Sequence, residues 1–164
     1  MAFWTDADYD EHELVELVHD RSSGLTALIA IHSTHLGPAA GGTRFWHYAQ
    51  PDAAMRDVLR LSRGMSYKNA MAGLPMGGGK AVVLLEKGAR QTPEMLAAFG
   101  DAVDALGGRY VTAEDVGATE ADMLAISRRT PHVCGLPAQE GAIGGDPGPF
   151  TAMGIYLGIK AAVS

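Results

Sequence analysis

The stretch Gly64-Met-Ser-Tyr-Lys-Asn-Ala-Met-Ala-Gly-Leu-Pro-Met-Gly-Gly-Gly-Lys80 joins the end of a predicted helix to the start of a predicted strand. Apolar residues recur before and within it at the three- and four-residue spacing of a helix with one buried face; they are Met55, Val58, Leu59, Leu61 and Met65. We expect this helix to begin at Pro51, a residue that suits the first helical position, and to end at Gly73. Lys80–Leu85, entered directly from the three glycines, is predicted to be a strand.

Strand and helix patterns alternate on both sides of this stretch. Upstream, His12–His19 and Leu25–His32 are predicted to form a hairpin that turns at Gly24, and residues 33–50 are predicted to be a loop. Downstream, we predict a helix, a strand and a second helix, at Thr92–Leu106, Arg109–Thr112 and Glu120–Arg129, the last with Met123, Leu124 and Ile126 facing inward. This order predicts an α/β fold with a mixed sheet and flanking helices.

Composition limits the class of protein. The chain has 164 residues, of which 47% are hydrophobic and 20% charged, which excludes a disordered chain. A net charge of −6 argues against binding to nucleic acid or to an acidic membrane surface. The acidic N-terminus, the single cysteine and the absence of a long apolar run lead us to expect a soluble, cytoplasmic protein.

The last segment has an unusual pattern. Gly141–Pro149 is predicted to be a linker, and an apolar helix is predicted to begin at Pro149. No glycine cap, proline or polar tail ends this helix before Ser164. We therefore expect the helix to pack on residues further along, as in a truncated chain.

Two lysines among glycines are the first candidates for chemistry. A phosphate-binding loop fails at Leu74 and Ala81, and a dinucleotide fingerprint fails because the glycines precede a strand rather than follow one. If Lys68 and Lys80 converge, one can lose its proton and act as a base while the other binds a carboxylate. The glycines at 77–79 would then admit a planar ligand. Two ordinary surface lysines remain the alternative.

Other motifs leave two interpretations open. Glu114 and Asp115 follow a predicted strand, where they suit either catalysis or the capping of the next helix. Gly41 and Gly42 suit either contact with a ligand or a tight turn. The scattered histidines and Cys134 offer no metal-ligand spacing, and Cys134 is expected to be an inert buried thiol.

Four segments in order resemble the Glu/Leu/Phe/Val dehydrogenase family, and most closely its leucine, phenylalanine and valine dehydrogenases. They are Gly37–Arg44, Leu59–Ala70, Gly77–Lys80 and Thr112–Gly117. The resemblance implies NAD-dependent, reversible oxidative deamination of a hydrophobic L-amino acid to a 2-oxo acid and ammonia. It also implies that residues 1–140 form a substrate-binding and oligomerisation domain, and that 141–164 lead to an NAD-binding domain absent from these residues.

The resemblance assigns roles residue by residue. It implies that Lys68 binds the substrate carboxylate, that Lys80 is the general base, and that Asp115 handles the amino group and proton transfers. Substrate-pocket positions are implied at Ala40, Gly41, Gly42 and Met65, and a position near the nicotinamide at Thr151.

The sequence departs from the family pattern in two places. Ala40 replaces a frequent leucine, which would deepen the pocket, and Asp146-Pro-Gly-Pro149 replaces an Asn-Pro-Ser-Pro-like segment. We expect a homo-oligomer that shows no NAD turnover by itself. An isolated oligomerisation scaffold and an amino-acid-binding module are the alternatives.

Overall fold

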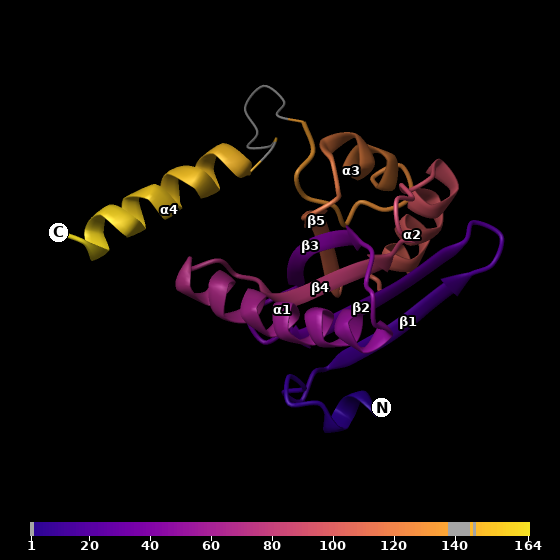
Figure 1. Cartoon of the computed structure of the whole chain (residues 1–164), viewed down its shortest axis with the longest axis horizontal. Helices are drawn as coiled ribbons and strands as arrows, with labels where there is room; N and C mark the ends of the chain where they lie inside the picture. Colours follow the sequence, from indigo (N-terminus) through magenta and orange to yellow (C-terminus); the bar gives the residue numbers. More distant parts are fainter. Residues whose placement is uncertain (1, 138–144, 146) are drawn as a thin grey trace.

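A five-stranded mixed sheet forms the centre of the computed structural model, which describes residues 2–137, 145 and 147–164 (Figure 1). The strand order is β1-β2-β4-β3-β5. Strands β4, β3 and β5 run parallel to one another, whereas β2 is antiparallel to both β1 and β4. The strands span Leu14–Asp20 (β1), Leu25–Ser33 (β2), Ala39–Trp46 (β3), Gly77–Leu84 (β4) and Tyr110–Glu114 (β5). The predicted mixed α/β sheet is confirmed.

The hairpin of β1 and β2 is also confirmed, with Gly24 in its turn at a φ of +73°. The predicted loop over residues 33–50 is wrong, because Ala39–Trp46 forms β3 between β4 and β5. Glycines in the middle of this strand hid it from a pattern based on side chains. Gly41 and Gly42 are therefore buried strand residues rather than turn residues.

Helices cover both faces of the sheet (Figure 1). Helix α1 (Pro51–Met71) packs on one face against β2 and β4, and α2 (Pro93–Ala105) and α3 (Glu120–Ile126) pack on the other. The α1 face buries a core of aliphatic side chains from Leu28, Ala30, Ala54, Val58, Leu59 and Val82. The bounds of α1 agree with the prediction, and Gly73 follows it with a φ of +68°.

The N-termini of α2 and α3 are capped by threonines. Thr92 accepts a hydrogen bond from Met95 N, and Thr119 forms a capping box with Asp122. Helix α3 ends at Ile126, earlier than predicted, and its buried side chains are Met123 and Ile126. Leu124 is 43% exposed, so its predicted inward orientation is wrong. Only a narrow stripe of side chains on this short helix faces the sheet.

The three glycines before Lys80 belong to β4 itself. A Cβ on Gly78 would lie 2.2 Å from Ser66 N, and one on Gly79 would lie 2.7 Å from the Tyr110 ring. The space beside these residues is thus filled by α1 and β5, and the predicted approach of a planar ligand to glycines 77–79 is wrong. The glycines allow α1 to lie directly on the sheet.

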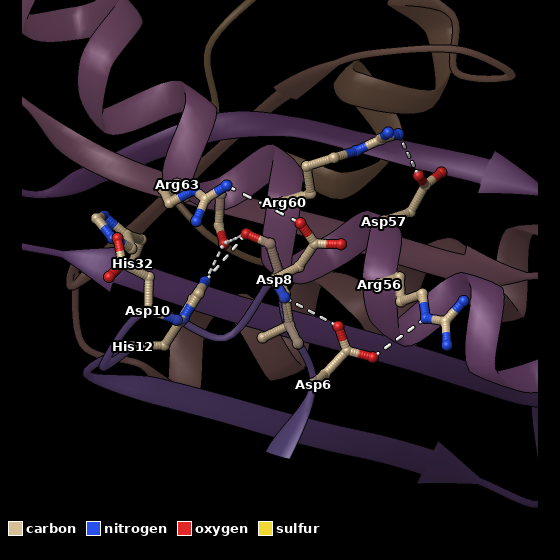
Figure 2. Close-up of polar contacts among 11 residues, drawn as sticks. Asp6, Asp8, Asp10, His12, His32, Arg56, Asp57, Arg60 and Arg63 are labelled. Atoms are coloured by element: carbon tan, nitrogen blue, oxygen red, sulfur yellow. Dashed lines mark hydrogen bonds and ion pairs between the residues drawn. The ribbon is translucent and has the colours of Figure 1, made fainter. Parts of the chain in front are cut away.

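Charged contacts tie the N-terminal segment, which includes a short 3-10 helix at Phe3–Thr5, to α1 (Figure 2). Asp6 pairs with Arg56 at 3.1 Å and Asp8 with Arg63 at 3.9 Å. Buried His12 donates from Nε2 to the Leu59 carbonyl at 3.0 Å. These contacts fix the start of the chain beside the helix.

Helix α4 (Gly148–Ala162) begins close to the predicted position and lies apart from the sheet in Figure 1, with all its residues exposed. Most of the predicted linker at 141–149 lies outside the described residues. No helix in the described part of the chain is long and apolar enough to cross a membrane.

Candidate active site

An ion pair connects strand β4 to the residue that follows β5, although these two strands are not neighbours in the sheet. Lys80 in β4 is 5% exposed, and its Nζ lies 2.9 Å from Oδ2 of Asp115, the residue that follows β5. Strand β3 runs between them, and its register with β4 places Thr43 beside Ala81, so that Gly42 is level with Lys80. A side chain on Gly42 would lie 2.9 Å from Asp115 Cβ. The glycine therefore leaves room for the pair to form across the middle strand.

The pKa of both partners is lowered, but for different physical reasons. Burial lowers the pKa of Lys80 below its ordinary value, and the positive charges of Arg44 and Lys68 act in the same direction, against the opposing effect of Asp115. Burial alone would raise the pKa of Asp115, but hydrogen bonds and charges from Lys80 and Arg44 outweigh it and lower that pKa. The expected depression of one lysine pKa is confirmed in direction for Lys80.

Arg44 joins the pair to helix α1. Its Nε donates to Asp115 Oδ2 at 2.9 Å, and its Nη1 donates to Asp57 Oδ2 at 2.8 Å. The hydroxyl of Tyr48 donates to the same Asp57 oxygen at 2.8 Å. Burial and the bond to Asp57 raise the pKa of Tyr48 to about 12, so this hydroxyl stays a donor at ordinary pH.

Helix α1 brings further predicted residues to the same side of the sheet. Lys68 is exposed, and its charge is close enough to Lys80 to lower the pKa of that lysine. Met65 lies over Gly41, since a Cβ on that glycine would be 3.2 Å from Met65 Cγ. Of the two predicted lysines, Lys80 is buried and Lys68 is open to solvent, and their convergence on one cleft stays a prediction.

Two buried side chains hold the backbone of the glycine-containing strands. Asn69 Nδ2 donates to the Gly77 carbonyl at 2.6 Å and lies 3.4 Å from the Ala40 carbonyl oxygen. The Tyr110 hydroxyl, which is fully buried, donates to the Gly41 carbonyl at 2.7 Å. The main chain at Ala40 and Gly41 is therefore fixed from both faces of the sheet.

Other predicted residues lie elsewhere. Thr151 is exposed in the first turn of α4, on a helix that makes no buried contact with the sheet. Cys134 is exposed, so the prediction of a buried thiol is wrong. In the part of the chain that the structure describes, no three His, Cys, Asp or Glu side chains are grouped as metal ligands.

Sequence reasoning gave no role to Arg44, Asp57, Tyr48, Asn69 or Tyr110. A signal existed for Arg44, which ends the Gly37–Arg44 segment. No local pattern could have paired Arg44 with Asp115, because 71 positions separate them. For Glu114 and Asp115 the capping interpretation is wrong, because Thr119 and Asp122 cap the following helix. Asp115 instead enters the ion pair with Lys80, and its catalytic role stays a prediction.

Comparison with known proteins gives a consistent result. Residues 12–132 match the family model described as "Glu/Leu/Phe/Val dehydrogenase, dimerisation domain". Leucine dehydrogenase from Bacillus subtilis is 51% identical over 94% of this chain and 42% of its own length. Valine dehydrogenase from Streptomyces virginiae is 52% identical over 95% of this chain and 43% of its own length.

Solved structures agree with this fold. The crystal structure of L-tryptophan dehydrogenase from Nostoc punctiforme matches 93% of this chain with a TM-score of 0.74 and 44% identity, and the match covers 42% of that protein. A hetero-hexameric glutamate dehydrogenase from Thermus thermophilus matches with a TM-score of 0.62 at 22% identity, which shows the fold alone. The chain thus spans less than half the length of the relatives it matches.

Proposed function

The chain belongs to the Glu/Leu/Phe/Val dehydrogenase family, and from this premise we propose that it is the substrate-binding and catalytic part of an NAD-dependent L-amino acid dehydrogenase. The proposed substrate is a hydrophobic L-amino acid, converted reversibly to its 2-oxo acid and ammonia. The observation that carries the proposal is the Lys80–Asp115 pair at 2.9 Å, in which Lys80 is buried. Relatives about half identical in sequence that act on leucine and valine support the class of substrate.

Each charged side chain has a proposed task. Exposed Lys68 binds the substrate carboxylate, as a protonated amine suits an anion. Asp115 accepts a hydrogen bond from the substrate amino group. Lys80, whose pKa is lowered by burial, takes a proton from the water that attacks the iminium carbon. The resulting carbinolamine then expels ammonia as its C–N bond breaks and its hydroxyl oxygen forms the carbonyl of the 2-oxo acid.

The chemistry that NAD would supply, when bound, is an acceptor for the hydride of the substrate Cα. The 164 residues do not fit this cofactor by themselves, because the sequence holds no Gly-x-Gly-x-x-Gly fingerprint between a strand and a following helix. Thr151, the predicted contact, stands on a helix apart from Lys80. We therefore propose that NAD binds residues outside this chain, and we expect no NAD reduction by these 164 residues alone.

Assembly is a second proposed role. The description of the matching family model as a dimerisation domain favours self-association of this chain into a homo-oligomer. A chain that assembles without binding an amino acid would be a scaffold, and one that binds without assembling would be a binding module.

Ligand binding by the 164-residue chain tests the proposal. We expect L-leucine, L-valine or their 2-oxo acids to raise the melting temperature, and L-glutamate to do so less. A ligand present at a hundred times its Kd adds about 2.7 kcal/mol of stability. Lys68→Ala should abolish the rise in melting temperature. Lys87→Ala removes an exposed lysine from the loop after β4 and should preserve the rise. Equal responses of the two variants would contradict the role of Lys68.

A further inference from the structure

We propose that Arg44 is a positioning residue for the Lys80–Asp115 pair: held by Asp57, it fixes one orientation of the Asp115 carboxylate and competes with Lys80 for one oxygen of that carboxylate. The inference rests on the proposed function for its catalytic meaning. The arrangement of the side chains supports it independently.

The first support is the geometry at one oxygen. Arg44 Nε and Lys80 Nζ both lie 2.9 Å from Oδ2 of Asp115. An ammonium group is a rotatable point charge and leaves a carboxylate free to turn, whereas a guanidinium is planar and directs its donors along fixed lines. Arg44 is thus the partner that can define the plane of the Asp115 carboxylate.

The second support is that Arg44 is itself held. Its Nη1 bonds Asp57 at 2.8 Å, and Asp57 takes a bond from Tyr48 at the same oxygen. Arg60 reaches the other oxygen of Asp57 at 2.9 Å from the solvent side (Figure 2). Side-chain exposures of 21% for Arg44 and 19% for Asp57, against 60% for Arg60, place the first two in the partly buried layer.

The third support is the balance of charge. Two cations that share one carboxylate oxygen are at most about 6 Å apart, where like charges in a partly buried site repel strongly. Asp115 by itself would hold the proton on Lys80, and Arg44 competes for the same oxygen. In line with this, the charge of Arg44 contributes to lowering the pKa of Lys80. Arg44 thereby offsets part of the effect of Asp115.

The test measures the titration of Lys80 directly. The chain has four lysines, Lys68, Lys80, Lys87 and Lys160, so the ε-CH2 signals of a 13C-lysine-labelled sample can be assigned by single Lys→Arg variants. We expect Arg44→Gln to raise the midpoint of Lys80 by about one pH unit or more. Asp115→Asn should lower the midpoint. Arg60→Gln, which also removes a cation bound to Asp57, should leave it unchanged.

Arg44→Lys serves as the second variant, in case the glutamine variant fails to fold. It retains the charge but not the planar fork, so the Lys80 midpoint should rise by less than in Arg44→Gln. No rise in any folded Arg44 variant, or an equal rise in Arg60→Gln, would overturn the proposal.

This titration needs no substrate. If no amino acid binds the chain while Lys80 still responds to Arg44, then the proposed function fails and the positioning role stands. If amino acids bind and Lys80 does not respond, the positioning role fails alone.

Discussion

Replacing Gly78 with alanine should push helix α1 away from the sheet. The added Cβ would lie 2.2 Å from both N and Oγ of Ser66 and 2.5 Å from the Ser62 carbonyl oxygen. Two of these three atoms belong to the helix backbone, so rotation of a side chain cannot relieve the contact. To restore ordinary van der Waals separation, the helix must move by about 1 Å, and well-packed interiors resist such movement.

The expected loss of stability follows from this displacement. Overpacking a core costs about 1–3 kcal/mol and occasionally more. The upper end of this range applies to Gly78→Ala, because moving α1 also separates Val58 and Leu59, both 0% exposed, from the sheet. For a chain of this size, about 3 kcal/mol corresponds to a fall in melting temperature of roughly 6–12 °C.

Gly64→Ala provides the matched control, since it makes the same chemical change within helix α1 itself, at a position with open space. Nothing lies within 4 Å of a Cβ at Gly64, and alanine is the better helix former by about 0.5–1 kcal/mol. We therefore expect Gly64→Ala to be neutral or stabilising, and Gly78→Ala to be strongly destabilising, in urea and thermal unfolding followed by circular dichroism. Equal stability of the two variants would refute the role assigned to Gly78.

Two further predictions concern buried polar groups. Tyr110→Phe removes the donor to the Gly41 carbonyl and should cost about 1–3 kcal/mol in urea unfolding, because that hydroxyl is fully buried; an unchanged midpoint would contradict the bond. His12 has its pKa lowered by burial, and its Nδ1 accepts a hydrogen bond from Asp10 N. The unfolded chain binds the proton near pH 6.5 and the folded chain only at lower pH, so the free energy of unfolding should fall as pH drops below 6.5. His12→Gln should flatten this slope, and an identical pH profile in both proteins would count against it.

Short sequence patterns alone predicted part of the fold of the 121 residues that the family model matches. Pro51 and Gly73 marked the ends of α1, and Gly24 marked the hairpin turn, because capping and positive φ are decided by a few adjacent residues. The central strand β3 was missed, since a strand that carries two glycines shows no alternation of side chains.

The candidate site also combines residues that local patterns predicted with contacts that only the fold creates. Local patterns predicted two lysines and an acidic motif as candidates, because their residue types and their places on a helix, in a strand and after a strand can be assigned from neighbouring residues. The strand order decided that Lys80 meets Asp115 across Gly42, and that Arg44, 71 positions from Asp115, completes the group. It also decided which lysine is buried, and therefore which has its pKa lowered. Burial and long-range contact depend on how strands and helices pack together, and only the tertiary structure fixes that packing.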